Sequence, residues 1–356
     1  DKRALPAPEY QEDGDRYRAP ANEIEEALAG IYAQVLGLER VGVEDSFFDL
    51  GGDSLSAMRV VAAINKRLDT QLAVRTLFHA PSIRSLSQQL GTAASEVEVV
   101  PIEILKEGTG VPLFCIHPGG GMSWPYQRLG VYLDCSIIGI QQTLLGEEAE
   151  PQSIRDMAKN YADRIQGVQP TGPYNLLGWS FGGVVAHELA IELQRRGCVV
   201  PRLILLDAQP SIDDSVTVLN GASVELDTLE EALRFYGIDI PERDGSLTDE
   251  ELEALVRERI AAEFPRQKQL LDWLVQNLDN NKALQRAHEP GVLESDLIVF
   301  SAVRDESDRS STALQEWRPY VAGDIAEHSI DCTHEEMLTA ESVRLYGQQL
   351  KFLLEG

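Results

Sequence analysis

Basic residues are scarce in this chain of 356 residues, which has 31 lysines and arginines against 58 aspartates and glutamates and a formal net charge of −27. Nucleic acids and anionic membranes select for basic surfaces, and the sequence contains no run of lysine or arginine. We therefore expect neither a nucleic-acid partner nor a membrane partner. No segment approaches the roughly 18 uninterrupted apolar residues of a membrane-spanning helix, and the N-terminus is polar, so we predict no transmembrane segment and no signal peptide.

Cysteine is also sparse, and its four positions lack the usual metal-binding spacings. No Cys-x-x-Cys pair occurs. Cys115 and Cys332 each have a histidine two residues later, but neither pair has the further ligands that a structural zinc needs. We predict no metal site. So few cysteines are typical of a reducing compartment, and we expect a cytoplasmic protein.

The sequence pattern predicts two structured parts, each preceded by a linker. The length predicts two or three domains, and the content of 43% hydrophobic and 25% charged residues is typical of globular protein. Residues 1–20 combine three prolines, many charges and no periodicity, which indicates a linker. Residues 91–98, a run of small and polar residues, predict a second, short linker.

Residues 21–90 have the hydrophobic pattern of a small helical bundle. Apolar residues at steps of three and four predict a helix over 21–38, capped by Asn22 and ended by Gly37. A second helix is expected over 54–68. Two shorter ones are expected over 74–78 and 82–90, separated by Pro81. Together these segments predict four helices.

From residue 98 onward the pattern changes to short, continuous apolar runs separated by helix-like segments, of which 154–168 and 183–196 are the clearest. Continuous runs are typical of strands buried on both faces, and the alternation with helices predicts a mostly parallel sheet in an α/β fold. Seven such runs occur: VVPIEIL, VPLFCIH, CSIIGIQ, YNLLGWS, RLILLDA, DLIVFSA and IAEHSID.

One interval, about 208–290, contains no strand run. Helical stretches over 229–236, 249–264 and 267–287 occupy it instead. An insertion of this size is too long for a loop. We predict a helical lid over the carboxyl edge of the sheet; an independent domain is the alternative.

Residues 178–182, Gly-Trp-Ser-Phe-Gly, follow a strand run and precede a helix. A sharp turn between strand and helix needs glycine at the flanking positions and leaves the serine hydroxyl exposed above the sheet. The alternative is a tight turn whose serine only caps the helix. We predict that Ser180 is a nucleophile.

A nucleophilic serine needs a base, and the base needs an acid that orients it. The chain order expected for this fold is serine, then the acid, then histidine. His334 follows the last strand run and is therefore the predicted base. Asp207 and Asp305 each end a strand run after the nucleophile helix. Spacing alone does not separate these two candidate acids.

Stabilising the charge that develops in acyl transfer needs two backbone N–H groups. We expect one from Phe181, the residue after the nucleophile. The other is expected from the loop His-Pro-Gly-Gly-Gly over 117–121, where glycines let the backbone approach a substrate.

In the helical part, residues 50–56 place Ser54 at the start of the second helix after two glycines. A serine at a helix N-terminus is a suitable place for a phosphate group. The alternative is an ordinary glycine-rich turn with a helix cap.

The segment DSFFDLGGDSLSAMRV resembles the modification site of peptidyl carrier proteins in nonribosomal peptide synthetases, over about residues 21–90. The resemblance implies that Ser54 carries a 4′-phosphopantetheine arm, attached by a phosphopantetheinyl transferase, whose thiol holds the peptide. Residues 1–20 look like the end of an adenylation domain, which implies upstream adenylation and condensation domains as partners.

Residues 99–356 resemble type I thioesterase domains of the enterobactin synthase kind, through HPGGG, YLDCSIIGIQ, LLGWSFGG, LLDAQP and DCTHEEML. The family has an α/β-hydrolase fold. It places its acid at the end of the strand after the nucleophile helix, which favours Asp207. The resemblance of the loop favours Gly119 as the second oxyanion donor, with Gly120 still open.

The order carrier, then thioesterase, implies that a peptidyl thioester passes from the arm to Ser180 and is released. Release as an acid by hydrolysis or as a ring by macrocyclisation remains open. One alternative is a lipase or esterase fused to a helical docking module. Another is a degenerate hydrolase that only docks partners.

Overall fold

The computed structural model of the chain describes residues 17–52, 54–68, 70, 72, 74–90, 100–143, 151–211, 268–304 and 312–355. The chain divides into two compact units, Asp1–Glu96 and Val97–Gly356. Each unit is described by itself. No helix in the described part of the chain is long and apolar enough to span a membrane.

The first unit contains the helices expected from the sequence: α1 (Glu23–Leu36), α2 (Ser54–Leu68), α3 (Val74–His79) and α4 (Ile83–Gln89). The side chain of Asn22 accepts a hydrogen bond from the backbone of Glu25 and caps α1, and Gly37 ends this helix with φ 68°. Both predicted helix signals are therefore confirmed. The buried residues of this unit include Leu28, Tyr32, Phe47, Val61, Ile64, Leu77 and Leu86.

The second unit is built on one seven-stranded sheet of order β1-β3-β2-β4-β5-β6-β7. β1 pairs antiparallel with β3, and every other pair is parallel, which confirms the prediction of a mostly parallel sheet. The strands are β1 (Ile102–Lys106), β2 (Leu113–Ile116), β3 (Ile137–Ile140), β4 (Asn175–Trp179), β5 (Arg202–Leu206), β6 (Leu297–Ala302) and β7 (Ile325–Ile330).

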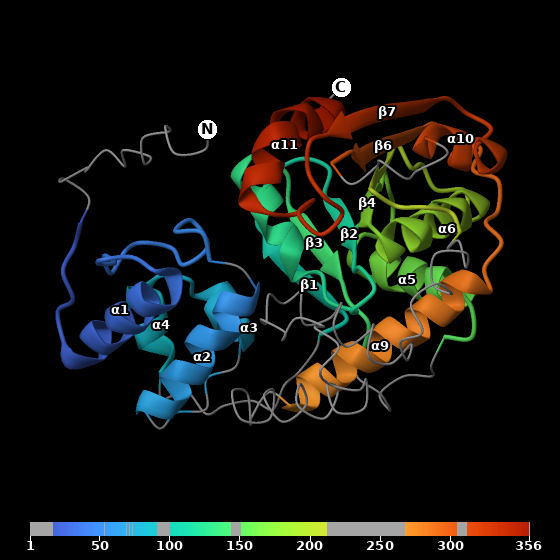
Figure 1. Cartoon of the computed structure of the whole chain (residues 1–356). Coiled ribbons are helices and arrows are strands. Elements are labelled where there is room, and N and C mark those ends of the chain that lie inside the picture. Colours follow the sequence, from blue (N-terminus) through green and yellow to red (C-terminus); the bar gives the residue numbers. More distant parts are fainter. Residues whose placement is uncertain are drawn as a thin grey trace, which may run out of the picture. The chain divides into compact units, whose positions relative to one another are not determined.

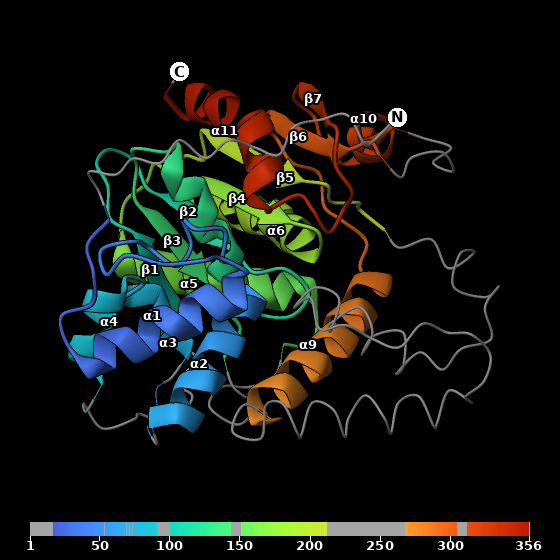
Figure 2. The same ribbon diagram turned by 60° about the vertical axis from the view of Figure 1, so that its left-hand side comes forward.

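Helices cover both faces of this sheet, and successive residues of β2 point to opposite faces. Phe114 and Ile116 pack with residues of α5 (Ile154–Val168), α6 (Phe181–Arg195) and α10 (Ala313–Trp317). Leu113 and Cys115 pack with residues of α11 (Ala340–Glu355) and of the 3-10 helix η1 (Trp124–Val131). Figures 1 and 2 show α11 and the pair α5 and α6 on different sides of the strands. A second 3-10 helix, η4, spans Arg318–Tyr320.

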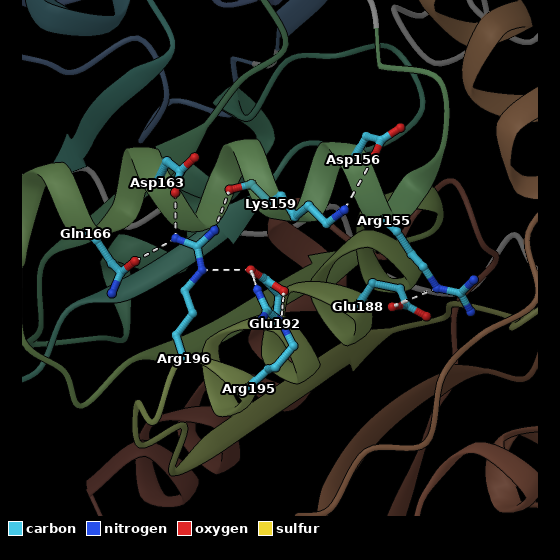
Figure 3. Close-up of polar contacts among 9 residues, drawn as sticks. All are labelled: Arg155, Asp156, Lys159, Asp163, Gln166, Glu188, Glu192, Arg195 and Arg196. Carbon is cyan, nitrogen blue, oxygen red and sulfur yellow. Dashed lines mark hydrogen bonds and ion pairs between the residues drawn. The ribbon is translucent and has the colours of Figure 1, made fainter.

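A network of charged side chains ties α5 to α6 (Figure 3). The guanidinium group of Arg196, just after α6, donates to Asp163 at 2.5 Å and to Gln166 at 2.7 Å on α5. It also donates to Glu192 at 2.7 Å, and Arg195 binds the same carboxylate through two nitrogens. Hydrogen bonds from Arg195 and Arg196 lower the pKa of Glu192 to about 2. The helix α6, which directly follows Ser180, is thus fixed to its neighbour by several charges acting together, which stabilise more than an isolated surface pair.

Of the predicted lid at about 208–290, the structure describes 208–211 and 268–290, and the second stretch contains the helix α9 (Lys268–Arg286), drawn in orange in Figures 1 and 2. The prediction of a helix over 267–287 is confirmed. The expected helices over 229–236 and 249–264 lie outside the described residues, as do residues 1–16 of the first linker and residues 91–98 of the second.

Candidate active site

Ser180 lies in the turn between β4 and α6, as the Gly-x-Ser-x-Gly pattern predicted. Its backbone has φ 55° and ψ −129°, which is a strained conformation for a residue with a side chain. A Cβ atom on Gly178 would lie 2.1 Å from the carbonyl oxygen of Gly182. One on Gly182 would lie 2.5 Å from backbone oxygens of both Ile116 and His117. Both glycines are therefore required sterically, and the turn holds the serine at the N-terminus of a helix.

Asp207 directly follows β5, and both its backbone and its side chain make hydrogen bonds to β6. Its backbone N–H donates to the carbonyl of Phe300 at 2.7 Å, and its Oδ1 accepts from the N–H of Ala302 at 3.1 Å. Its backbone also has a positive φ, 43°, and the residue is only 5% exposed. The second carboxylate oxygen of Asp207 is thereby aimed in one fixed direction.

His334 joins these two residues. Its Nδ1 lies 2.6 Å from Asp207 Oδ2, and its Nε2 lies 3.0 Å from Ser180 Oγ. Because a carboxylate only accepts hydrogen bonds, the proton belongs on Nδ1, and Nε2 is free to accept from the serine hydroxyl. The indole of Trp179 packs against the imidazole with ring centroids 5.5 Å apart. This order of hydrogen bonds is the one that nucleophilic catalysis by serine requires.

The loop that carries His334 is held by an arginine that no sequence motif singled out. Arg304 follows β6 and donates to the carbonyl of Asp331 at 2.6 Å and to the carboxylate of Glu336 at 2.5 Å. Its Nε lies 3.3 Å from Asp331 Oδ1. Since Asp331 and Glu336 flank the histidine, these contacts fix the path of the loop on both sides of it.

Other acidic and histidine residues follow Ser180 in the chain. Asp305, the alternative acid, lies outside the described residues. His328 is a residue of β7, and its ring lies 5.1 Å from that of Phe300. His288, just after α9, places Nε2 3.3 Å from the carboxylate of Glu188.

In the glycine loop directly after β2, hydrogen bonds hold the carbonyl of Pro118. The carbonyl of Pro118 accepts from the N–H of Gly121 at 2.9 Å and lies 2.7 Å from Nδ1 of His117. No described residue accepts a hydrogen bond from the N–H of Gly119 or of Gly120. Phe181 is the first residue of α6, where backbone N–H groups have no partner within the helix. These amides are the candidate oxyanion donors.

His117 itself is a structural residue of this loop. Burial lowers its pKa to about 4, so the ring is neutral at physiological pH. Because Nδ1 donates to a carbonyl, Nε2 must accept, and the hydroxyl of Tyr161 donates to it at 2.6 Å. Sequence reasoning did not assign His117 this role.

In the first unit, Ser54 is the first residue of α2. The preceding turn is built for glycine: Gly51 has φ 95°, and a Cβ atom on Gly52 would lie 2.3 Å from the ring of Phe47. Such a turn into the N-terminus of a 15-residue helix fits a phosphodiester, because the helix dipole favours an anion there. The side chain of Ser54 lies outside the described residues.

Comparison with known proteins identifies both units. Residues 111–349, more than half of the chain, match the family described as thioesterase domain. The chain belongs to the thioesterase family. Residues 26–90 match the family described as phosphopantetheine attachment site, which identifies 4′-phosphopantetheine as the cofactor of this carrier–thioesterase pair. The predicted fold, a carrier bundle followed by an α/β-hydrolase, is confirmed, and so is the prediction of a thioesterase.

The relatives of this thioesterase are nonribosomal peptide synthetases. It is 35% identical over 368 residues to malpibaldin synthetase of Mortierella alpina and 33% identical over 373 residues to a dimodular nonribosomal peptide synthase of Bacillus subtilis (strain 168). Both alignments cover 100% of this chain but only 6% and 15% of the relatives, respectively. Among solved structures, a four-domain nonribosomal peptide synthetase in its holo form, bound to AMP and glycine, is similar with a TM-score of 0.64 and 26% identity, over 99% of this chain and 28% of that one.

Proposed function

We propose that the thioesterase releases a peptide from the neighbouring carrier through an ester on Ser180. The observation that carries this proposal is the chain of hydrogen bonds from Asp207 through His334 to Ser180, at 2.6 and 3.0 Å. In this proposal residues 21–90 are the carrier domain, 91–98 the linker, and 99–356 the thioesterase with its lid at about 208–290. Residues 1–20 are then the remnant of an adenylation domain.

The first half-reaction forms the acyl-enzyme. His334 Nε2 takes the hydroxyl proton of Ser180 as Oγ attacks the thioester carbonyl carbon. The backbone N–H of Phe181 and that of Gly119, or of its alternative Gly120, stabilise the oxyanion, and Asp207 stabilises the imidazolium. When the carbon–sulfur bond breaks, the imidazolium returns its proton to the departing thiolate. Peptide and Ser180 are then joined by an ester.

The second half-reaction repeats these roles. His334 removes a proton from the attacking group, which is water or a nucleophile of the peptide itself, and returns it to Ser180 Oγ as the ester breaks. Water gives a linear acid, and an internal nucleophile gives a ring. A lid that excludes water favours the ring.

On the carrier side, Ser54 would hold 4′-phosphopantetheine through a phosphodiester at the N-terminus of α2. When bound, that group supplies the thiol on which the peptide is presented as a thioester. Attachment requires a phosphopantetheinyl transferase, and loading requires upstream adenylation and condensation domains. These partners, and a cytoplasmic location, belong to the proposal.

The test of the carrier is the intact mass of the chain after incubation with coenzyme A and a phosphopantetheinyl transferase. We expect wild type and the matched control Ser56→Ala to gain one arm, and Ser54→Ala to gain none. If Ser54→Ala still gains the mass, the arm is elsewhere. If no form gains it, a lipase or esterase with a docking module is the better interpretation.

The test of release uses the same chain with a peptidyl arm loaded on it. We expect wild type to free the peptide, Ser180→Ala to keep it on the arm, and Ser180→Cys to hold it as a thioester on the thioesterase domain. Normal release by Ser180→Ala would refute the mechanism.

A further inference from the structure

The helix α9 of the predicted lid turns a row of amide side chains towards the body of the thioesterase. Asn277, Asn281 and Gln285 follow one another at steps of four residues and so share one face of the helix. They are only 1%, 0% and 8% exposed, respectively. Burying amides costs free energy unless they make hydrogen bonds. Their partners therefore indicate what this face is for.

Two of these amides bind the glycine loop that supplies a candidate oxyanion donor. Asn281 Nδ2 donates to the carbonyl of Gly119 at 2.7 Å and also to Gln142 Oε1 at 3.0 Å. Asn277 Nδ2 donates to the carbonyl of Gly120 at 3.4 Å. Asn281 Oδ1 has no hydrogen-bond partner among the described residues, so only the NH₂ group of this side chain offsets the cost of its burial there.

A peptide bond is planar and trans, so its carbonyl and its N–H point in opposite directions. Holding the carbonyl of Gly119 therefore fixes the direction of the N–H of Gly120. The preceding peptide is fixed in the same way, because the carbonyl of Pro118 is held by His117 and by the N–H of Gly121. Glycine has no side chain to restrict such a loop, and an unrestrained peptide could rotate and present its carbonyl oxygen where an N–H is needed.

We propose that Asn281 is a positioning residue: by holding the carbonyl of Gly119 it locks the peptide between Gly119 and Gly120, so that the N–H of Gly120 serves as the oxyanion donor of the glycine loop. The inference rests on the proposed function of Ser180 and of this loop. Asn281 does not touch the reacting atoms. It acts through the backbone, and it couples the seating of α9 on the body to the ability to stabilise an oxyanion.

The test compares Asn281→Leu, which keeps the volume and removes the donor, with Asn280→Leu on the same helix as the matched control. The residue Asn280 is only half-buried and has no partner in the described part of the chain. The first probe is a fluorophosphonate, whose phosphorus binds Ser180 Oγ and loses fluoride while negative charge develops on its oxygen. We expect the maximal labelling rate of Asn281→Leu to fall roughly 10- to 100-fold with unchanged half-saturation, somewhat less than the loss from deleting an oxyanion donor outright.

The second probe separates positioning of the oxyanion hole from general damage. In a Ser180→Cys background, iodoacetamide alkylates the thiolate by direct displacement, which needs the nucleophile and His334 but no oxyanion hole. We expect the alkylation rate to be the same with Asn281 and with Leu at that position. A parallel fall in both rates, or a fall in fluorophosphonate labelling of less than five-fold, would overturn the proposal.

A second variant and the labelling of wild type separate misfolding and failure of the proposed function from failure of the role of Asn281. If Asn281→Leu does not fold, Asn281→Asp takes its place, since it keeps the shape but puts an acceptor against the carbonyl of Gly119, and the same loss is expected. If wild type is not labelled at Ser180 at all, the proposed function fails. If wild type and Asn281→Leu are labelled equally fast, only the role of Asn281 fails.

Discussion

Replacing Asp207 by asparagine tests the candidate active site most sharply, because the structure dictates how the new side chain must sit. The N–H of Ala302 donates to Oδ1 of residue 207 at 3.1 Å, so the amide oxygen of asparagine takes that place. Its NH₂ group then faces Nδ1 of His334, where the carboxylate oxygen now lies at 2.6 Å. The backbone, at φ 43°, suits asparagine, which tolerates left-handed conformations.

This exchange reverses the tautomer of the imidazole. With a donor at Nδ1, the ring must carry its proton on Nε2, and that nitrogen can no longer accept the proton of Ser180. The loss of a correctly protonated base in a serine triad slows catalysis by about 10⁴-fold, or about 5 kcal/mol of barrier. The geometry of the site is expected to stay intact, so substrate binding should change little.

The assay is the rate of Ser180 labelling by a fluorophosphonate, followed by intact mass, with Asp305→Asn as the matched control. We expect Asp207→Asn to be slowed by roughly 10⁴-fold at saturating probe. The control should react at the wild-type rate. A loss of less than ten-fold for Asp207→Asn, or a large loss for Asp305→Asn, would refute the assignment of the acid.

Three further predictions concern stability. Ser180→Gly should be more stable than Ser180→Ala by about 1–2 kcal/mol, because glycine relieves the positive φ, and thermal unfolding of the two inactive variants would show it. Gly182→Ala should destabilise the thioesterase, because its Cβ meets two backbone oxygens at 2.5 Å; an unchanged melting temperature would contradict this. Burial lowers the pKa of His187 to about 4 from its ordinary 6.5, so unfolding takes up a proton and stability falls as the pH drops from 6.5 to 4. Between pH 4 and 6.5, His187→Phe should lower the number of protons taken up on unfolding by about one, measured as the slope of the unfolding free energy against pH. The same slope in wild type and variant would refute the buried neutral histidine.

Local patterns were sufficient for most of the second unit. The helix expected over 154–168 is α5 without change, because Ser153 caps it and its apolar residues line one face. The nucleophile helix begins two residues earlier than predicted, at Phe181, because the turn at Ser180 is tighter than the pattern revealed. Strand runs predicted the parallel sheet because continuous apolar segments are typical of buried strands.

What the sequence left open depends on which elements become neighbours. Asp207 and Asp305 both end strand runs, and only the order of the strands distinguishes them. In the sheet β5 pairs directly with β4, opposing Leu206 to Trp179, so the residues that follow each strand come together at one edge. Spacing along the chain contains no such information.

The contacts of Arg304 and Asn281 were missed for a similar reason. Both side chains donate hydrogen bonds to backbone carbonyls, and a sequence does not say which carbonyl will lie within reach of a long side chain or of a buried helix face. A signal did exist in the row Asn277, Asn281 and Gln285, because three amides on one helix face are unusual for a surface that packs against a protein core.

The proposed base comes from the segment after β7, 154 residues beyond the nucleophile, and β7 is the edge strand laid down last. During synthesis the chain emerges in order, so the carrier and Ser180 leave the ribosome well before His334 does. On the proposed mechanism, a polypeptide truncated before this segment would keep Ser180 and lack the base that activates it.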